Sequence, residues 1–91
     1  MEAIWKFQLQ ATDVQEIEMP SGAEILCVQV QNEIPCIWAK VFPESPTRKR
    51  QFETIGTGHR ISPIPQRRKY IGTYLLDNDQ LVFHVFELIS L

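Results

Sequence analysis

The sequence predicts an all-β protein, a small single-domain antiparallel β-sandwich or partly open β-barrel of about seven strands. Apolar and polar residues alternate with a period of two along most of the chain, which is typical of half-buried strands. Turn-forming residues recur roughly every eight to twelve positions, and no window has the period of an amphipathic helix. Because no linker or break in composition argues for two domains, we expect one β-domain over residues 1–91.

The first half of the chain supplies four predicted strands, at residues 3–10, 14–19, 25–31 and 36–42. In the first, Trp5 and Phe7 alternate with lysine and glutamine. Pro20-Ser21-Gly22 predicts the turn after the second strand, and Asn32-Glu33 predicts a hairpin turn after the third. Pro35 fits best at the first position of the fourth strand or on a sheet edge.

The second half supplies three more predicted strands, at residues 51–57, 70–76 and 81–89. Prolines predict irregular loops at residues 43–47 and 62–66. The last two strands form the clearest hairpin, joined by Asp77-Asn78-Asp79, whose residues tolerate left-handed backbone. The final strand is apolar on both faces apart from His84, so both faces should be covered. One cover is the core, and we expect the second to be another subunit of a homo-oligomer.

Cysteine usage and hydropathy indicate a cytoplasmic protein without metal or cofactor. Cys27 and Cys36 could face each other across a hairpin, but reduced apolar thiols are the favoured interpretation because no secretory signal precedes them. The spacing of the two cysteines and two histidines matches no zinc site. No apolar run approaches the roughly 20 residues that a membrane-spanning helix needs.

The charge of the chain is concentrated in residues 48–69. This segment holds seven basic residues and one acid, a net charge of +6. Residues 1–47 carry two basic and seven acidic side chains, and residues 70–91 carry three acids, so the whole chain has a formal charge of -2. A field concentrated in this way attracts anions.

The segment Gly56-Thr57-Gly58-His59-Arg60 is the central candidate ligand site. Two glycines allow a ligand to approach the backbone, and Thr57, Gly58, His59 and Arg60 would then contact an anion. The segment is neither a P-loop, since no Gly-Lys-Ser/Thr follows, nor a dinucleotide fingerprint, since no helix follows. The alternative is a glycine-bearing turn or bulge that ends a strand.

Two basic clusters flank this segment, Arg48-Lys49-Arg50 and Arg67-Arg68-Lys69. They could clamp opposite ends of one ligand. The arginines assigned to ligand binding are Arg48, Arg50, Arg67 and Arg68. The alternative is that these clusters are solvated strand ends that suppress aggregation. The negative net charge and the scarcity of aromatic residues near the clusters argue against nucleic acid as the partner.

No catalytic residue is predicted. The sequence contains no pattern typical of a nucleophile, and neither histidine has a catalytic partner close to it in the sequence. His84 lies within an apolar strand and is expected to be structural or interfacial, whereas His59 could contact a ligand or form part of a turn. A hydrolase acting through His59 is the weakest of the functional hypotheses.

The order of several motifs along the chain is distinctive: Ile4-Trp5-Lys6-Phe7, Ile17-Glu18-Met19-Pro20, Pro35-Cys36-Ile37-Trp38-Ala39, Gly56-Thr57-Gly58-His59, Tyr70-Ile71-Gly72-Thr73 and Leu81-Val82-Phe83-His84. This order resembles a family of short uncharacterised proteins encoded in phages and prophages, over nearly the whole chain. Phage proteins of this size commonly interfere with host systems, including by sequestering nucleotide second messengers of antiphage signalling. The resemblance implies such an anti-defence role in the host cytoplasm and assigns no residue.

The leading expectation is therefore a non-enzymatic homo-oligomer that binds and sequesters a small anionic ligand of nucleotide type. The alternative is a protein-interaction inhibitor that docks its basic loop on an acidic surface of a host defence protein. The sequence gives the sign of the ligand's charge, and leaves open whether the basic segment forms a pocket or a solvated surface.

Overall fold

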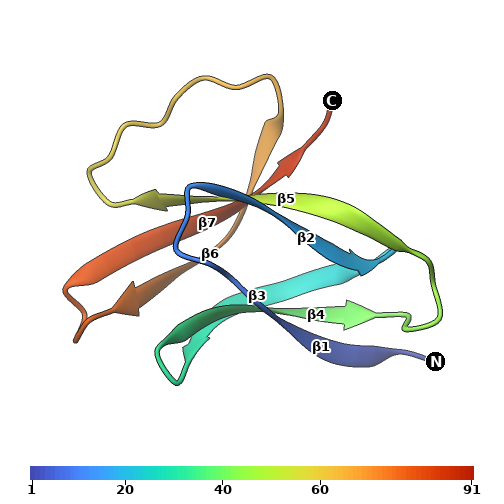
Figure 1. Ribbon diagram of the computed structural model, residues 1–91. Helices are drawn as coiled ribbons and strands as arrows, with labels where there is room; N and C mark the ends of the chain where they lie inside the picture. Colours follow the sequence, from blue (N-terminus) through green and yellow to red (C-terminus); the bar gives the residue numbers. More distant parts are fainter.

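A computed structural model describes residues 1–91 and confirms the all-β prediction, with seven strands, no helix and two antiparallel sheets (Figure 1). The strands are β1 (Ala3–Gln8), β2 (Val14–Pro20), β3 (Glu24–Gln31), β4 (Ile34–Val41), β5 (Thr47–Gly56), β6 (Arg67–Leu76) and β7 (Leu81–Ile89). Both predicted hairpin turns are present. Their residues have positive φ, 51° and 65° at Asn32 and Glu33, and 52° to 65° at Asp77, Asn78 and Asp79.

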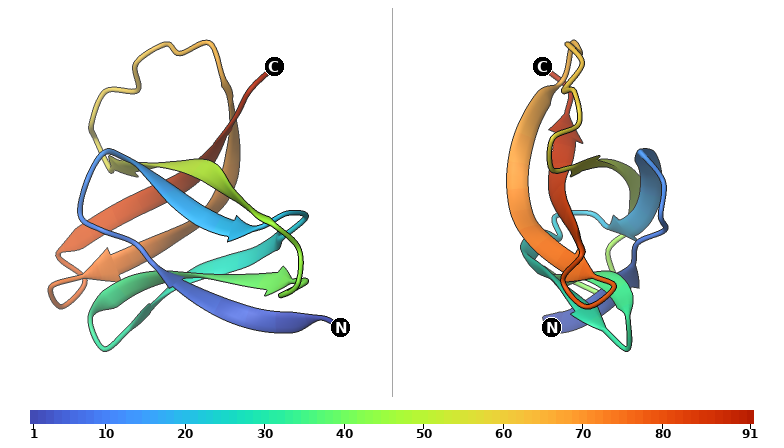
Figure 2. Two further views of the ribbon diagram at one scale, coloured as in Figure 1. Left: turned by 45° about the vertical axis from the view of Figure 1, so that its right-hand side comes forward. Right: turned by 90° about the vertical axis from the view of Figure 1, so that its left-hand side faces the viewer.

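The three-stranded sheet has the order β1-β4-β3, and the four-stranded sheet has the order β2-β5-β7-β6. The side view of Figure 2 shows β6 and β7 forming one wall of the molecule, with β2 on the other side. The walls meet where β3 lies against β6, and a Cβ atom built on Gly72 would be 2.7 Å from Cγ1 of Val28. The architecture is therefore a small sandwich that is partly closed along this one seam.

The core lies between the two sheets and follows from the period-two pattern. Phe52 of β5, Met19 of β2 and Ile37 of β4 are fully buried. Ten buried residues form one cluster, to which every strand except β1 contributes, and β1 packs Phe7 against it. Burial of such alternate apolar residues is the main favourable term in folding.

Two strands begin three or four residues earlier than the sequence pattern predicted. β5 starts at Thr47 instead of residue 51, and β6 starts at Arg67 instead of residue 70. Antiparallel pairing extends both strands, since Met19 of β2 lies opposite Arg48 and Ile89 of β7 lies opposite Arg67. The two basic clusters are therefore parts of strands, where backbone pairing outweighs the loop-like composition.

β7 is an inner strand of its sheet, paired with β5 on one side and β6 on the other. On its face away from the core, Val82, His84, Phe86 and Leu88 are all half-buried in the single chain. The ring of Tyr70 packs edge-on against Phe86, with 5.6 Å between ring centroids. The neighbouring strand thus supplies part of the cover that the sequence assigned to another subunit, and the homo-oligomer stays a prediction.

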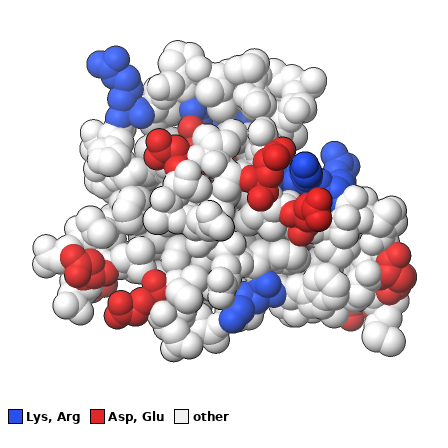
Figure 3. Space-filling model, viewed as in Figure 1, with Lys and Arg blue, Asp and Glu red and all other residues white.

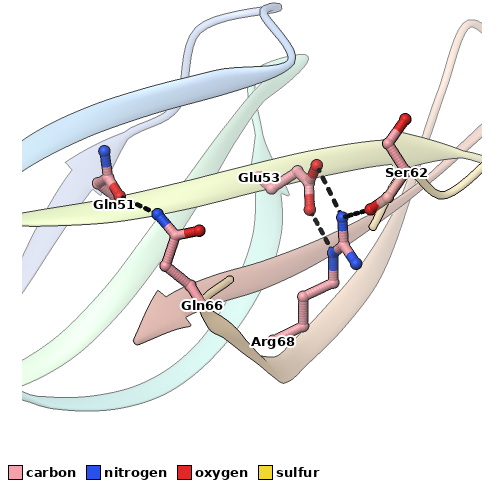
Figure 4. A network of polar contacts seen from close by, with 5 residues as sticks. All are labelled: Gln51, Glu53, Ser62, Gln66 and Arg68. Carbon is pink, nitrogen blue, oxygen red and sulfur yellow. Dashed lines mark hydrogen bonds and ion pairs between the residues drawn. The ribbon is translucent and has the colours of Figure 1, made fainter. Parts of the chain in front are cut away.

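Residues 57–66 form a crossover from β5 to β6. Both strands run antiparallel to β7, so they run parallel to each other, and the chain must return along the sheet between them. Figure 2 shows this crossover rising above the strands. Figure 4 shows how it is held: Arg68 Nη2 donates to the Ser62 carbonyl at 2.7 Å, and Gln66 Nε2 donates to Gln51 Oε1 at 3.4 Å.

Arg68 also pairs with Glu53 across the sheet. Its Nε donates to one carboxylate oxygen at 2.6 Å and its Nη2 to the other at 3.4 Å. The hydrogen bond to Glu53 raises the pKa of Arg68, and burial opposes this rise. Arginine stays protonated at all ordinary pH values, and this ion pair joins β6 to β5, while the hydrogen bond from Arg68 to Ser62 holds the crossover.

Replacing Arg68 with alanine should loosen the crossover before it affects the rest of the fold. The substitution removes the hydrogen bond to Ser62 and the ion pair with Glu53. We expect faster amide hydrogen exchange in residues 57–66 and little change in β3 and β4. Arg67→Ala is the matched control, because Arg67 is exposed and forms no ion pair. Equal exchange rates for residues 57–66 in Arg68→Ala and Arg67→Ala would show that Arg68 does not hold the crossover.

Both cysteines are free; Cys36 is buried, and Cys27 is half-buried. Cys36 lies opposite Gln29 and Cys27 lies opposite Trp38, so the two cysteines are not direct cross-strand neighbours. The structure contains no helix with the length and hydropathy that a bilayer crossing requires.

Candidate functional site

The eight residues that the sequence assigned to ligand binding do not form one site. Thr57, Gly58, His59 and Arg60 follow the end of β5, whereas Arg48 and Arg50 lie near its start. A ten-residue strand is about 30 Å long. Arg67 and Arg68 begin β6, and Arg68 lies opposite Leu88, which in turn lies opposite Gln51 of β5. The structure thus brings the two basic clusters together and separates them from the glycine turn.

The glycine turn uses most of its polar groups internally. The His59 N–H donates to the Gly56 carbonyl at 3.0 Å, and the Thr57 N–H donates to the Val82 carbonyl at 3.1 Å. Gly58 has a φ of 85°, so the turn needs its second glycine for backbone conformation. Among the N–H groups of Thr57, Gly58 and His59, only that of Gly58 forms no backbone hydrogen bond and is left for an anion. The turn therefore matches the alternative interpretation of a glycine-bearing strand end.

The side chains of the turn are also engaged. Thr57 Oγ1 lies 2.7 Å from His84 Nε2, and the ring of His59 lies over Gly56, where an added Cβ would meet its Nδ1 at 3.0 Å. Arg60 is exposed and forms no ion pair. Only Arg60 among the residues of this segment presents an uncommitted cation.

Arg50 is committed to the fold. Its Nε and Nη2 donate to the two carboxylate oxygens of Glu87 at 2.6 and 2.9 Å, and its Nη1 donates to the Ala23 carbonyl at 2.6 Å. The side chains of Arg50 and Glu87 are 18% and 9% exposed. This bidentate pair joins β5 to β7 and holds the turn between β2 and β3. Glu87 neutralises the charge of Arg50, and Glu53 neutralises that of Arg68.

A groove of about 520 Å³ lies beside the start of β5. β5 pairs with β2 from Thr47 onwards but with β7 only from Gln51. The strands β5 and β7 therefore part at Gln51, and the groove occupies this fork. We call it the basic groove, and its charged lining residues are Glu16, Arg48, Lys49, Arg50, Lys69 and Glu87.

Three cations of the basic groove have no carboxylate partner. Arg48, Lys49 and Lys69 are exposed and form no ion pair. Arg50 and Glu87 neutralise each other, and Glu16 is the one remaining acid in the lining. The groove thus keeps a net charge of +2. Figure 3 shows that basic and acidic side chains intermix over the region of β2 and β5 on this face of the molecule.

The backbone at the start of β5 also offers hydrogen-bonding groups to the basic groove. Between Thr47 and Arg50, the edge of β5 away from β2 has no strand partner. Its main-chain N–H and C=O groups are therefore open to a ligand in the groove. N–H groups beside cationic side chains are a common arrangement for binding phosphate and carboxylate.

Two of the three free cations of the groove were missed as site residues. Lys49 and Lys69 belong to the basic clusters, but the arginines were the predicted ligand contacts because guanidinium binds anions in bidentate fashion. The structure shows that two of these arginines have carboxylate partners, 37 and 15 residues away along the chain. Without those pairings, no sequence signal distinguishes the free cations from the committed ones.

A hydrogen-bonded chain crosses the face of the four-stranded sheet away from the core. Tyr70 donates to or accepts from Thr73 at 2.6 Å, Thr73 lies 2.9 Å from His84 Nδ1, and His84 Nε2 lies 2.7 Å from Thr57. A hydroxyl beside an imidazole is the geometry of an activated nucleophile. Neither Thr57 nor His84 lines the basic groove or the second large cavity of the molecule.

Comparisons with known proteins place the chain in one family. The model of a family described as a domain of unknown function (DUF7352) matches residues 1–90. No curated protein and no solved structure matches the chain. Within the structure, no group of three or more His, Cys, Asp or Glu side chains is arranged to hold a metal ion.

Proposed function

Because the chain belongs to this family of unknown function, its own residues must indicate its role, and we propose that it is a non-enzymatic domain that binds and sequesters a small anionic ligand in the basic groove. The observation that supports this most directly is the convergence of Arg48, Lys49 and Lys69, all without carboxylate partners, on one groove. Uncompensated cations in a concave site attract anions and raise their local concentration.

The shape of the basic groove favours a phosphate-bearing ligand of nucleotide size. Its volume of about 520 Å³ is within the range of small-molecule sites. Lys69 lies on β6, and Arg48 and Lys49 lie on β5, so the cations approach the groove from both sides of β7. Such a distribution suits a ligand with two separated negative groups, such as a pyrophosphate or a dinucleotide.

Lys69→Ala should weaken binding of such ligands about fivefold to tenfold, because one charge-assisted hydrogen bond is lost. Titration calorimetry at low salt with inorganic pyrophosphate, cyclic dinucleotides, cyclic oligoadenylates and ADP-ribose would measure the change. The affinity should fall as salt is raised. The ligand should be recovered unchanged after denaturation of the complex, as expected without turnover.

Arg60→Ala is the matched control for this experiment. It also removes one exposed, unpaired cation, but from the crossover and not from the basic groove. We expect unchanged affinity for the same probes. If Arg60→Ala weakened binding as much as Lys69→Ala, the ligand would belong to the glycine turn. If none of the probes bound at high protein concentration, the proposed function would be wrong.

A second candidate function is docking on an acidic protein surface, favoured by the exposure of all three free cations. Capture of a stoichiometric partner from host lysate, lost on charge reversal of Arg48 and Lys49, would support it over small-ligand binding. Arg50 is unsuitable for such a reversal because it holds Glu87 and the Ala23 carbonyl. The fold should remain intact when Arg48 and Lys49 are reversed, since neither forms an ion pair.

The finer expectations stay predictions. They are phage origin, action in the host cytoplasm, interference with antiphage signalling through a nucleotide second messenger, and a homo-oligomer. Native mass spectrometry of protein purified from infected cells would test the homo-oligomer and the bound nucleotide, because it reports both the subunit count and any retained small molecule.

A further inference from the structure

A second cavity, of about 400 Å³, lies at the opposite end of β5 from the basic groove. The segment between β1 and β2, the β3–β4 hairpin turn and the ends of β5, β6 and β7 enclose it, and His59 lines it beside Gly56. Its apolar walls include Leu9, Leu76 and Phe83. We call it the Tyr74 cavity, after the most buried polar residue of its lining.

One buried hydroxyl group in the Tyr74 cavity lacks a hydrogen-bond partner. Thr54 Oγ1 is buried with no partner, although the Thr54 N–H donates to the Asp13 carbonyl at 2.8 Å. Tyr74 is 4% exposed, and its phenol lies beside the Thr54 side chain. Burial raises the pKa of Tyr74, and the neighbouring Thr54 hydroxyl opposes this rise, so the phenol stays protonated at neutral pH and can donate. Buried polar groups without partners are costly, and a ligand that pairs with them recovers that cost.

The charge around the Tyr74 cavity has the opposite sign from that of the basic groove. Asp13 and Glu33 line it, both are exposed, and neither forms an ion pair. His59 is the only basic residue type in the lining. The lining therefore combines two exposed carboxylates with the buried Thr54 hydroxyl and the buried Tyr74 side chain.

We propose that the Tyr74 cavity binds a small amine with a compact apolar or aromatic body. The ammonium group faces Asp13 and Glu33, and the body packs against Leu9, Leu76 and Phe83. A hydroxyl at the far end of the ligand meets Thr54 and Tyr74. This site is independent of the proposed function, because the basic groove shares none of its lining residues and has the opposite charge.

Three probes of similar size separate the parts of this proposal: tyramine, which has an ammonium and a hydroxyl; phenethylamine, which lacks the hydroxyl; and phenylpropionate, which replaces the ammonium with a carboxylate. Titration followed by amide chemical shifts reports both affinity and location. We expect tyramine to bind most tightly, phenethylamine more weakly, and phenylpropionate not to bind. Shifts should map to residues of the Tyr74 cavity. Phenylpropionate binding as tightly as phenethylamine would overturn the proposal.

Two variants test whether Asp13 and Thr54 contact the ligand. Asp13→Asn should weaken both amines about fivefold, because it removes one carboxylate and keeps the side-chain shape. Thr54→Val should raise the melting temperature, since it removes an unpartnered buried hydroxyl, and should abolish the preference for tyramine over phenethylamine. Unchanged amine affinity in Asp13→Asn, or a tyramine preference that survives Thr54→Val, would contradict the assignment. Lys69→Ala is the control and should leave amine binding unaltered.

Discussion

Replacing Arg50 with methionine should lower the free energy of unfolding by about 3–5 kcal/mol. Methionine keeps much of the length of the arginine stem but removes the guanidinium. The Glu87 carboxylate, 7% exposed, would then be left buried without its bidentate partner, and the Ala23 carbonyl would lose its donor. Small domains have only about 5–15 kcal/mol of stability in total, so the loss should be visible as a much lower denaturation midpoint in urea.

Arg48→Met is the matched control for this prediction. It makes the same chemical change two residues earlier on β5, at an exposed position without an ion pair. We expect its stability to change by no more than about 0.5 kcal/mol. The double variant Arg50→Met, Glu87→Leu should recover most of the loss, because removing both charges leaves no unpaired group. Equal stability of the two single variants would show that the ion pair does not support the fold.

Gly72→Ala should cost about 1–3 kcal/mol through a clash at the seam between the two sheets. Gly72 lies at a β-bulge where the register between β6 and β7 shifts. A Cβ atom there would be 2.7 Å from Cγ1 of Val28, which is 5% exposed and closely packed. Real Cβ atoms do not approach other carbons so closely, so β3 and β6 would have to separate or Val28 would have to leave its rotamer.

A double-mutant cycle with Val28→Ala tests the cause of this loss. Val28→Ala alone should destabilise by leaving a small cavity, but it should also make room for the new methyl group. The combined variant is then expected to be more stable than the sum of the single effects predicts. Strict additivity in urea denaturation would mean that the seam does not limit the space at Gly72.

The sequence predicted the fold well because its signals are local. The alternation around Trp5 and Phe7 and the turn residues at Asn32 and Asp77 each act within a few positions, and all seven strands are present. The starts of β5 and β6 were predicted too late, because arginine and lysine resemble loop residues until their pairing strands are known. Pairing with β2 and β7 is long-range information that no local window contains.

The candidate site was less predictable for the same reason. The concentration of basic residues was visible, but the sequence could not show that Arg50 and Arg68 meet Glu87 and Glu53. The glycine turn looked suited to an anion until its N–H groups were found in backbone hydrogen bonds. The Tyr74 cavity combines residues from Leu9 to Phe83, so its existence depends on the complete fold.

The position of β7 has a consequence for how the chain folds. β7 is the last of the seven strands in sequence, yet it lies between β5 and β6 and joins them. While the chain is being synthesised, β5 and β6 leave the ribosome before the strand that pairs with both. The four-stranded sheet can therefore be completed only after Ile89 has emerged. Until then, β5 and β6 have unpaired edges facing the place of β7, and we expect chains stalled before Ile89 to aggregate more readily than the complete chain.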